Sequence, residues 1–238
     1  MLELHELTKR FGATTAVDGV SLRVPAGEML GVIGSSGAGK STLLRMVNRL
    51  AEPTSGRVTW DELDVTALRG RSLRQWRARC AMVFQQFNLA PRLTVLENVL
   101  MGCLGRKALV PSLLMLFSRE ERREAMEALE RVGMGAQALQ VAGSLSGGQQ
   151  QRVAIARALM QRPSIILADE PIAALDPRNA ERVMEILRQL NREDGLTVLV
   201  NLHHIETARA TCDRIVGVAA GRVVFDGREL SGASGGLA

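Results

Sequence analysis

Residues 34–41 place the strongest constraint on how this chain can fold. They read Gly-Ser-Ser-Gly-Ala-Gly-Lys-Ser, follow an apolar run at residues 29–33 and precede apolar residues at helical spacing between positions 43 and 50. A strand, a glycine loop and a helix in this order are typical of a phosphate-binding loop, because glycines let backbone N–H groups surround phosphate oxygens at a positive helix N-terminus. An ordinary glycine turn is the alternative, and the flanking strand and helix disfavour it. We expect phosphate contacts from Gly34, Ser35, Ser36, Gly37, Ala38, Gly39, Lys40, Ser41 and Thr42.

Two residues of this loop, and two acids further along the chain, have separate predicted roles. Lys40 is expected to reach the β- and γ-phosphates of a nucleotide, and the Ser41 hydroxyl to bind Mg²⁺. Residues 165–168 form a second apolar run, which ends in Asp169 and Glu170. Such a pair of acids is, alone, more often a helix cap or a solvated turn. Downstream of a phosphate-binding loop, it predicts that Asp169 holds the Mg²⁺ shell and that Glu170 orients or deprotonates the attacking water.

A second glycine-rich turn, at residues 145–149, reads Leu-Ser-Gly-Gly-Gln and precedes a predicted helix at residues 151–160. Its backbone amides and its serine hydroxyl can bind phosphate oxygens at a helix N-terminus. Because the turn has no lysine and no metal ligand, it would be a weak site on its own. The sequence therefore predicts a site shared with another phosphate-binding loop, with contacts from Ser146, Gly147, Gly148 and Gln149.

The spacing of apolar residues changes along the chain and indicates an α/β fold. Period-two alternation predicts strands at residues 2–7 and 20–24, whereas the middle third, residues 93–159, has helical patterning that includes an amphipathic helix at 119–132. Asp176 is expected to cap a helix that begins at Pro177 and ends near Gly195.

A predicted strand at residues 196–202 and a hairpin of residues 215–218 and 223–225 complete the pattern. Strands that alternate with helices predict a largely parallel sheet. We expect one domain over residues 1–238, with an N-terminal antiparallel β region, a helical sub-lobe at about residues 86–160 and a low-complexity tail at 231–238.

The charge balance leaves two interpretations open. The chain of 238 residues has a net charge of +5, and five arginines lie between Arg69 and Arg79 around Trp76. A basic stretch beside an aromatic residue is a feature of nucleic-acid contacts. A solvated arginine-rich face is the preferred interpretation, because no nucleic-acid-binding motif accompanies the stretch.

Cysteine usage and hydropathy bear on the cellular compartment. Three cysteines without a CxxC pair predict neither a disulfide framework nor a zinc site, which fits a reducing cytosol. The N-terminus lacks the basic start and apolar centre of a signal peptide. The most apolar stretch, residues 108–117, contains Pro111 and Ser112 and is shorter than the roughly 20 residues that span a bilayer. We therefore expect a cytoplasmic chain whose membrane role is peripheral.

Taken in this order, the motifs at residues 34–41, 145–149 and 165–170 resemble those of the ABC transporter ATPases, and the resemblance covers essentially the whole chain. It implies a P-loop NTPase core with an antiparallel β subdomain and a helical signature subdomain, which binds and hydrolyses Mg-ATP. Residues 145–149 are similar to the signature of the family. The resemblance also implies a homodimer packed head to tail, in which the signature of each copy completes the ATP site of the other. Phe11 corresponds to the aromatic residue that stacks on adenine in the family, and core packing is the alternative for its side chain.

The resemblance assigns roles to further polar residues. Gln85 is similar to the Q-loop glutamine that senses Mg²⁺ and the permease, and Gln86 beside it leaves the register open. Asp176 is similar to the D-loop aspartate that crosses the dimer interface. His203, which directly ends an apolar run and is therefore preferred to His204, resembles the switch histidine that contacts the γ-phosphate.

Within the family, residues 84–106, 190–195 and 200–203 resemble the phosphonate-import ATPases. This implies ATP-driven uptake of phosphonates, or of phosphate or phosphite, with permease subunits in the membrane and an extracytoplasmic substrate-binding protein. The chain would lie at the cytoplasmic face of the inner membrane and contact the permease through residues 85 to about 117, with internal packing as the alternative. Import of polar amino acids, export, and a soluble ATPase acting on nucleic acid are the other functions considered, and no nucleic-acid partner is expected.

Overall fold

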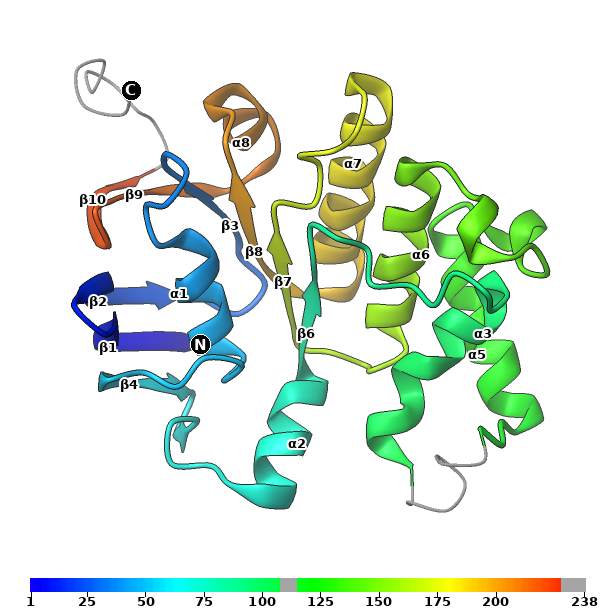
Figure 1. The fold of residues 1–238 in the computed structure, drawn as a ribbon, viewed down its shortest axis with the longest axis horizontal. Helices are drawn as coiled ribbons and strands as arrows, with labels where there is room; N and C mark the ends of the chain where they lie inside the picture. Colours follow the sequence, from blue (N-terminus) through cyan, green and yellow to red (C-terminus); the bar gives the residue numbers. More distant parts are fainter. Residues whose placement is uncertain (108–114, 228–238) are drawn as a thin grey trace.

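The computed structural model describes residues 1–107 and 115–227, which form two β-sheets surrounded by helices (Figure 1). The smaller sheet is antiparallel and has the strand order β2-β1-β4-β5. The larger sheet has the order β10-β9-β3-β8-β7-β6 and is parallel except at the edge pair of β9 and β10. The strands are β1 (Leu2–Phe11), β2 (Thr14–Val24), β3 (Met29–Ile33), β4 (Ser55–Trp60), β5 (Leu63–Asp64), β6 (Cys80–Val83), β7 (Ile165–Asp169), β8 (Thr197–Leu202), β9 (Arg214–Ala219) and β10 (Arg222–Gly227).

Helices connect the parallel strands. α1 (Lys40–Val47) follows β3, α7 (Pro177–Asp194) joins β7 to β8, and α8 (Ile205–Thr211) joins β8 to β9. Such crossovers return the chain to the amino edge of the sheet, so the next strand can run parallel to the last. The other helices are α2 (Gly70–Arg79), α3 (Val95–Leu100), α5 (Arg119–Arg131) and α6 (Gly147–Leu159), with short 3₁₀ helices η1 (Met101–Arg106), η2 (Gly135–Gln137) and η3 (Ala142–Ser144).

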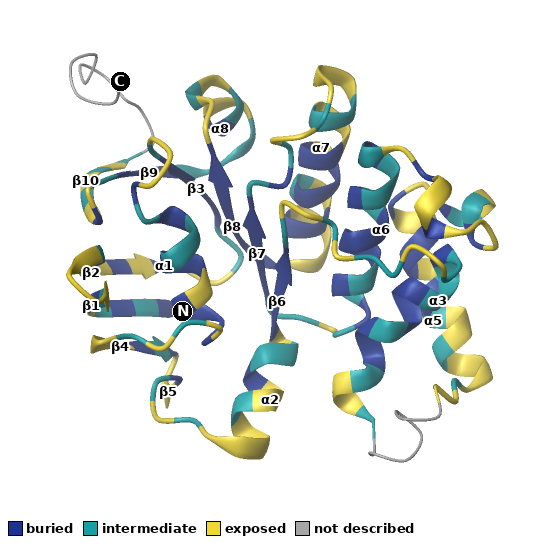
Figure 2. Ribbon diagram, in the orientation of Figure 1, coloured by how far each residue is buried: buried dark blue, intermediate teal, exposed yellow. Residues whose placement is uncertain are grey.

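Each face of the parallel sheet packs into its own apolar core. Leu30 and Val32 of β3 belong to a core that also contains the apolar face of α1 and residues of the antiparallel sheet. Met29 and Ile33 belong to a second core, built with residues of α3, α5, α6, α7 and α8. Figure 2 shows β7 and β8 buried along their length, which explains why these strands are mostly apolar and do not alternate between apolar and polar residues.

The carboxyl ends of four parallel strands meet at one edge of the sheet. Ile33 of β3 pairs with Leu202 of β8, and Asp169 of β7 pairs with Asn201 of β8. Val83, the last residue of β6, pairs with Ala168 of β7. The segments that follow these strands therefore lie side by side, and they are the segments that carry the predicted chemistry.

The structure confirms the predicted α/β fold with an antiparallel β region and a helical portion. α7 begins at Pro177 with Asp176 as its N-cap, and the chain turns at Gly195 in the left-handed conformation, as predicted. The hairpin of β9 and β10 and the helix beginning at Arg119 are also confirmed. α3, α5 and α6 pack on one another in the region of the predicted sub-lobe, whose boundaries stay a prediction.

Other elements differ from the predictions. The first two strands are longer than expected, because β1 continues to Phe11 and β2 begins at Thr14. The helix predicted at residues 151–160 begins at Gly147, so part of the expected turn is its first helical turn. β4, β5, β6, α2 and α8 were not predicted. The tail at 231–238 and most of the apolar stretch at 108–117 lie outside the described residues. Among the described helices, none is long and apolar enough to cross a membrane.

The predicted basic stretch forms α2, and its tryptophan is a core residue. Trp76 is 2% exposed, and its indole Nε1 donates a hydrogen bond to the Val47 carbonyl oxygen at 2.9 Å. The ring is therefore not available to stack on a base. Arg71, Arg74 and Arg79 are exposed on the same helix, which agrees with an arginine-rich face in solvent.

Candidate functional site

The glycine loop leaves β3 at the carboxyl edge and turns directly into α1. Gly34 has a φ angle of 156°, and a Cβ at this position would collide with the carbonyl oxygen of Val218. Only glycine fits this approach of two backbones. The N-cap of α1, Gly39, supplies no side-chain hydrogen bond, so no side chain competes for the N–H groups at this helix N-terminus. These N–H groups can bind an anion, as the sequence predicts.

Lys40 lies inside the loop rather than in solvent. It is 4% exposed, and its Nζ donates hydrogen bonds to the carbonyl oxygens of Gly34 at 2.7 Å and Ser35 at 3.0 Å. Burial lowers the pKa of Lys40, and the nearby charges of Glu170 and Asp169 act in the opposite direction. The ammonium group is thus held where phosphate oxygens would meet it.

The side chain of Asp169, the last residue of β7, bonds to residues of α1 and β8. Its Oδ1 accepts hydrogen bonds from Ser41 Oγ at 2.7 Å and from Asn201 Nδ2 at 2.8 Å. Its Oδ2 lies 3.6 Å from Nη2 of Arg45. Sequence reasoning paired Ser41 with Asp169 through their predicted roles but missed Asn201 and Arg45. A polar residue inside the apolar run of β8 was the only sequence signal for Asn201.

Glu170 and His203 form a second pair at the same edge. His203 Nε2 lies 2.7 Å from Glu170 Oε1, because the neighbouring strands β7 and β8 end just before these residues. Glu170 has a φ angle of 51°, a left-handed conformation that is uncommon for a residue with a side chain. His204 is instead the N-cap residue of α8.

A cavity of about 860 Å³ opens onto this pair from the space between α7 and α8. Its wall includes apolar side chains such as Ile172, Leu175 and Met184 together with Glu170 and His203. Strained backbone and a carboxylate beside an accessible cavity are features of functional sites.

The predicted signature forms the N-terminus of α6. Ser146 is the N-cap: its side chain accepts a hydrogen bond from the Gln149 N–H, and the Gln149 side chain accepts one from the Ser146 N–H at 2.9 Å. This capping box also explains the earlier start of the helix. A Cβ on Gly148 would lie 2.5 Å from the side chain of Asn179 in α7, so glycine is required where the two helices meet.

The signature and the phosphate-binding loop lie apart within one chain. Figure 1 shows α1 and α6 on different sides of the molecule, with β7 and β8 between them. Within residues 1–107 and 115–227, no hydrogen bond or ion pair joins residues 146–149 to residues 34–42. Ser146 is exposed, as is Asp176, whose carboxylate accepts hydrogen bonds from Asn179 that lower its pKa.

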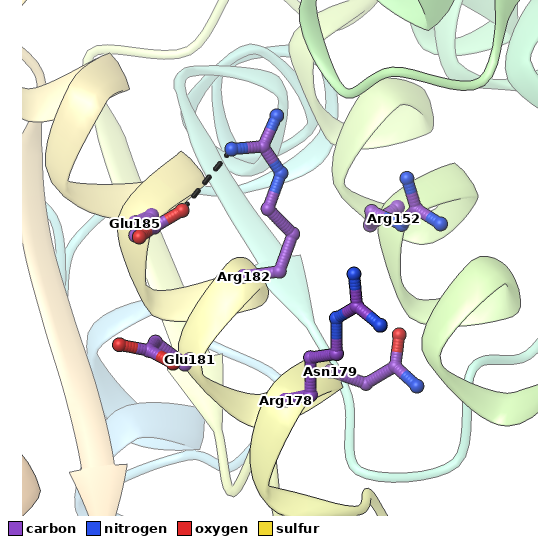
Figure 3. A pocket seen from close by; sticks show the side chains of 6 residues that line it. All are labelled: Arg152, Arg178, Asn179, Glu181, Arg182 and Glu185. Atoms are coloured by element: carbon purple, nitrogen blue, oxygen red, sulfur yellow. Dashed lines mark hydrogen bonds and ion pairs between the residues drawn. The ribbon is translucent and has the colours of Figure 1, made fainter.

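A polar hollow of about 520 Å³ is lined by Arg152 of α6 and by residues of α7 between positions 178 and 185. Figure 3 shows Arg152 of α6 and Arg178 of α7 reaching into it, while Arg182 bonds to Glu185 on its own helix at 3.1 Å. None of these residues belongs to the phosphate-binding loop. The hollow is therefore separate from the cluster around Asp169.

The remaining predicted residues are exposed. Phe11 ends β1 and is 55% exposed, so the alternative of core packing is wrong. Lys9 Nζ lies 4.8 Å from the centroid of its ring. Gln85 and Gln86 follow β6 at the carboxyl edge, beside β7, and both are exposed.

The donor atoms around Asp169 fit a hydrated Mg²⁺ ion. A hydroxyl and a carboxylate are the oxygen ligands that Mg²⁺ uses in nucleotide sites, where it keeps several of its waters. Asn201 Oδ1 is buried and has no hydrogen-bond partner among the described residues. A buried acceptor beside Asp169 can take a hydrogen bond from a metal-bound water. The arrangement can thus hold the phosphates and the metal of a nucleotide together.

Three comparisons agree with this arrangement. The family model described as ABC transporter matches residues 17–173. The chain is 60% identical over 228 residues to "Phosphonates import ATP-binding protein PhnC" of Rhizobium etli, an alignment that covers 96% of this chain and 81% of that protein. It is also 60% identical over 231 residues to a protein of the same name, numbered 2, from Rhodopseudomonas palustris, with coverage of 97% and 85%.

Solved structures also resemble this chain. A dimeric structure of a bacterial ABC transporter cassette has a TM-score of 0.85 and 38% identity, and covers 96% of this chain and 99% of that one. A dimeric post-hydrolysis state of an ATP-binding cassette, bound to ADP and Pi, has a TM-score of 0.84 at 38% identity with the same coverage. The chain therefore belongs to the ABC transporter family.

Proposed function

We propose that this chain is the ATP-binding and ATP-hydrolysing subunit of an ABC import complex that energises the uptake of phosphonates. The observation that carries the proposal is the cluster in which Ser41, Asn201 and Arg45 surround Asp169, with the Glu170–His203 pair beside it. The names of the relatives support phosphonates as the transported class.

In the proposed site, the loop amides and Lys40 bind the β- and γ-phosphates of ATP. Ser41 and Asp169 would hold Mg²⁺, with Gln85 as a further ligand, and the ion would neutralise charge that develops on the phosphate oxygens. The Lys40 ammonium would exchange its bonds to the loop carbonyls for bonds to phosphate, so its buried charge stays compensated. Phe11 would stack on adenine from its exposed position at the end of β1.

Glu170 is the proposed general base. Its carboxylate borders the cavity between α7 and α8, through which water can reach it, and it would accept the proton of the water that attacks the γ-phosphate. His203 holds Glu170 Oε1 from the neighbouring strand and would contact the γ-phosphate when ATP is bound. Both groups directly follow buried strands, which fix where their backbones lie.

A second copy of the chain would complete the site. Among the described residues of their own chain, the exposed Ser146 and the N–H groups of α6 face no phosphate-binding loop. They suit the phosphates of an ATP bound to a facing copy. Gly147, Gly148 and Gln149 would act with Ser146, and Asp176 would lie at the interface. The proposal is a head-to-tail homodimer with two shared ATP sites.

The other proposed partners are permease subunits in the membrane and an extracytoplasmic substrate-binding protein. The chain would bind peripherally at the cytoplasmic face of the inner membrane, with residues 85–107 as the described part of the permease contact. Import of polar amino acids is the second candidate, since residues 84–99 also resemble importers of that class.

The decisive experiment reconstitutes the complete complex in membranes and measures ATP hydrolysis while candidate ligands are supplied on the outer side. Methylphosphonate, phosphate, phosphite and polar amino acids form the test panel. Phosphonates should stimulate hydrolysis most. Stimulation by amino acids alone would make polar amino acids, and not phosphonates, the transported class. A complex that never hydrolyses ATP would refute the enzymatic assignment.

A further inference from the structure

A groove lies at the amino edge of the parallel sheet, opposite the edge that carries the loop and Glu170. α2 forms one of its walls, and η1 together with the turn between α6 and β7 forms the other. Its volume is about 1030 Å³. The groove is defined by its cationic residues, which are Arg71, Arg74, Arg79, Arg106, Lys107 and Arg162. No acidic residue belongs to its described lining.

Much of this positive charge is uncompensated. In the part of the chain that the structure describes, Arg71, Arg74 and Arg79 take part in no ion pair. Arg106 and Arg162 share one carboxylate, that of Glu124, and Lys107 is paired with Glu121 at 2.5 Å. Six cations therefore have two carboxylates between them, and this excess of positive charge, concentrated on α2, attracts anions to the groove.

The groove has a rigid floor. Trp76 belongs to its lining, and the hydrogen bond from its indole to the Val47 carbonyl oxygen holds α2 against α1. The ring of Trp76 also packs near that of Trp60, with 6.2 Å between the ring centroids. Arginines that project from an anchored helix lose less conformational freedom on binding than arginines of a loose loop. Guanidinium groups also match the oxygens of a phosphate or phosphonate group in pairs.

The hollow between α6 and α7 is a weaker candidate for the same chemistry. Its arginines share the wall with Glu181 and Glu185, and Arg182 is already bonded to Glu185 (Figure 3). An anion entering there would meet carboxylates at close range. The groove beside α2 has no carboxylate in its described lining, and its three α2 arginines, Arg71, Arg74 and Arg79, form no ion pair among the described residues, whereas Glu121 and Glu124 pair only with the cations of the opposite wall.

We infer that the groove beside α2 binds a phosphate-type oxyanion at a site separate from the nucleotide site. Such an anion would bridge α2 to η1 and Arg162, and Arg162 lies just beyond the end of α6, whose other end is the signature. The phosphate group can come from a small molecule in solution or from the headgroup of an anionic phospholipid. Arg106 and Lys107 also belong to the proposed permease contact, so the inference concerns the chain without its permease subunits.

Calorimetry on the full chain, first saturated with Mg-ADP so that the phosphate-binding loop is filled, tests the inference. Inorganic phosphate and methylphosphonate probe the soluble source. Vesicles of phosphatidylcholine with phosphatidylglycerol, compared with phosphatidylcholine alone, probe the lipid source. The test variant is Arg71→Gln/Arg74→Gln, and the control is Arg57→Gln/Arg192→Gln, which removes the same charge from exposed positions outside the groove.

At least one source should bind, and the test variant should bind it roughly tenfold more weakly, because two contacts of exposed guanidinium groups are lost. The control should bind like the wild type. Absence of binding by both sources, or equal weakening in the two variants, would overturn the inference. A short RNA that binds more tightly than either source and requires the same arginines would overturn it in favour of nucleic acid. Failure to bind ADP would count against the proposed function alone.

Discussion

Replacement of Glu170 by glutamine separates the chemistry of the proposed site from its nucleotide binding. The glutamine has the shape of glutamate and keeps an oxygen beside His203, whose Nε2 lies 2.7 Å from the present carboxylate. The contacts of Asp169 with Ser41 and Asn201 do not involve Glu170. Only the ability to take a proton is removed, so ATP should bind with nearly unchanged affinity.

Loss of a positioned general base slows a reaction by about 10² to 10⁴. This corresponds to an increase of about 2.7 to 5.4 kcal/mol in the activation free energy. Because both ATP molecules would stay bound between two copies, the variant should accumulate as a dimer.

Light scattering coupled to size-exclusion chromatography should show a shift from monomer to dimer when ATP is added, and a monomer with ADP. Steady-state phosphate release measures the rate. Glu62→Gln, at an exposed turn between β4 and β5, is the matched control and should hydrolyse ATP at the wild-type rate. A Glu170→Gln variant that turns over normally, or that stays monomeric at saturating Mg-ATP, would refute both the general-base role and the shared site.

Three further changes probe other parts of the chain. Lys40→Ala should nearly abolish ATP binding in calorimetry, since the buried ammonium is the loop's only lysine; unchanged affinity would contradict the phosphate-binding assignment. Ser146→Arg should leave nucleotide binding by the monomer intact but stop turnover, and a wild-type rate of hydrolysis would argue against a signature acting on a second copy. Asn191→Leu should lower the free energy of unfolding by about 2 to 4 kcal/mol in urea denaturation, because the carbonyls of Gly27 and Leu196 both lose their 2.8 Å hydrogen bonds; a loss below about 0.5 kcal/mol would show that water replaces the amide.

Local signals in the sequence predicted several features well. Asp176 followed by Pro177 predicts a helix start, since an N-cap side chain and a fixed φ angle act within one turn of the chain. Gly195 predicts the end of this helix, because glycine easily takes the left-handed conformation that it has there. The start of α6 was misplaced because its capping box at Ser146 and Gln149 was treated as a turn outside the helix.

Short strands with weak patterns were not predicted. β6 has four residues, and its apolar run is no longer than many helix segments, so its strand conformation depends on pairing with β7. β4 is exposed over half its length and is defined by pairing with β1. These segments are strands because they pair with neighbouring strands, and no local pattern in the sequence indicates that pairing.

The sequence by itself determined the chemistry of this protein: a glycine loop before a helix, a carboxylate pair after a buried strand, and a signature without a lysine. These motifs depend only on residue type and on the order of neighbouring residues, both of which the sequence contains. Only the tertiary structure decided that Asn201 and Arg45 meet Asp169, that His203 reaches Glu170, and that the arginines of α2 face Arg106 and Arg162 across a groove. Such contacts join residues that are distant in sequence, and the strand order and register that bring them together arise from packing of the whole sheet.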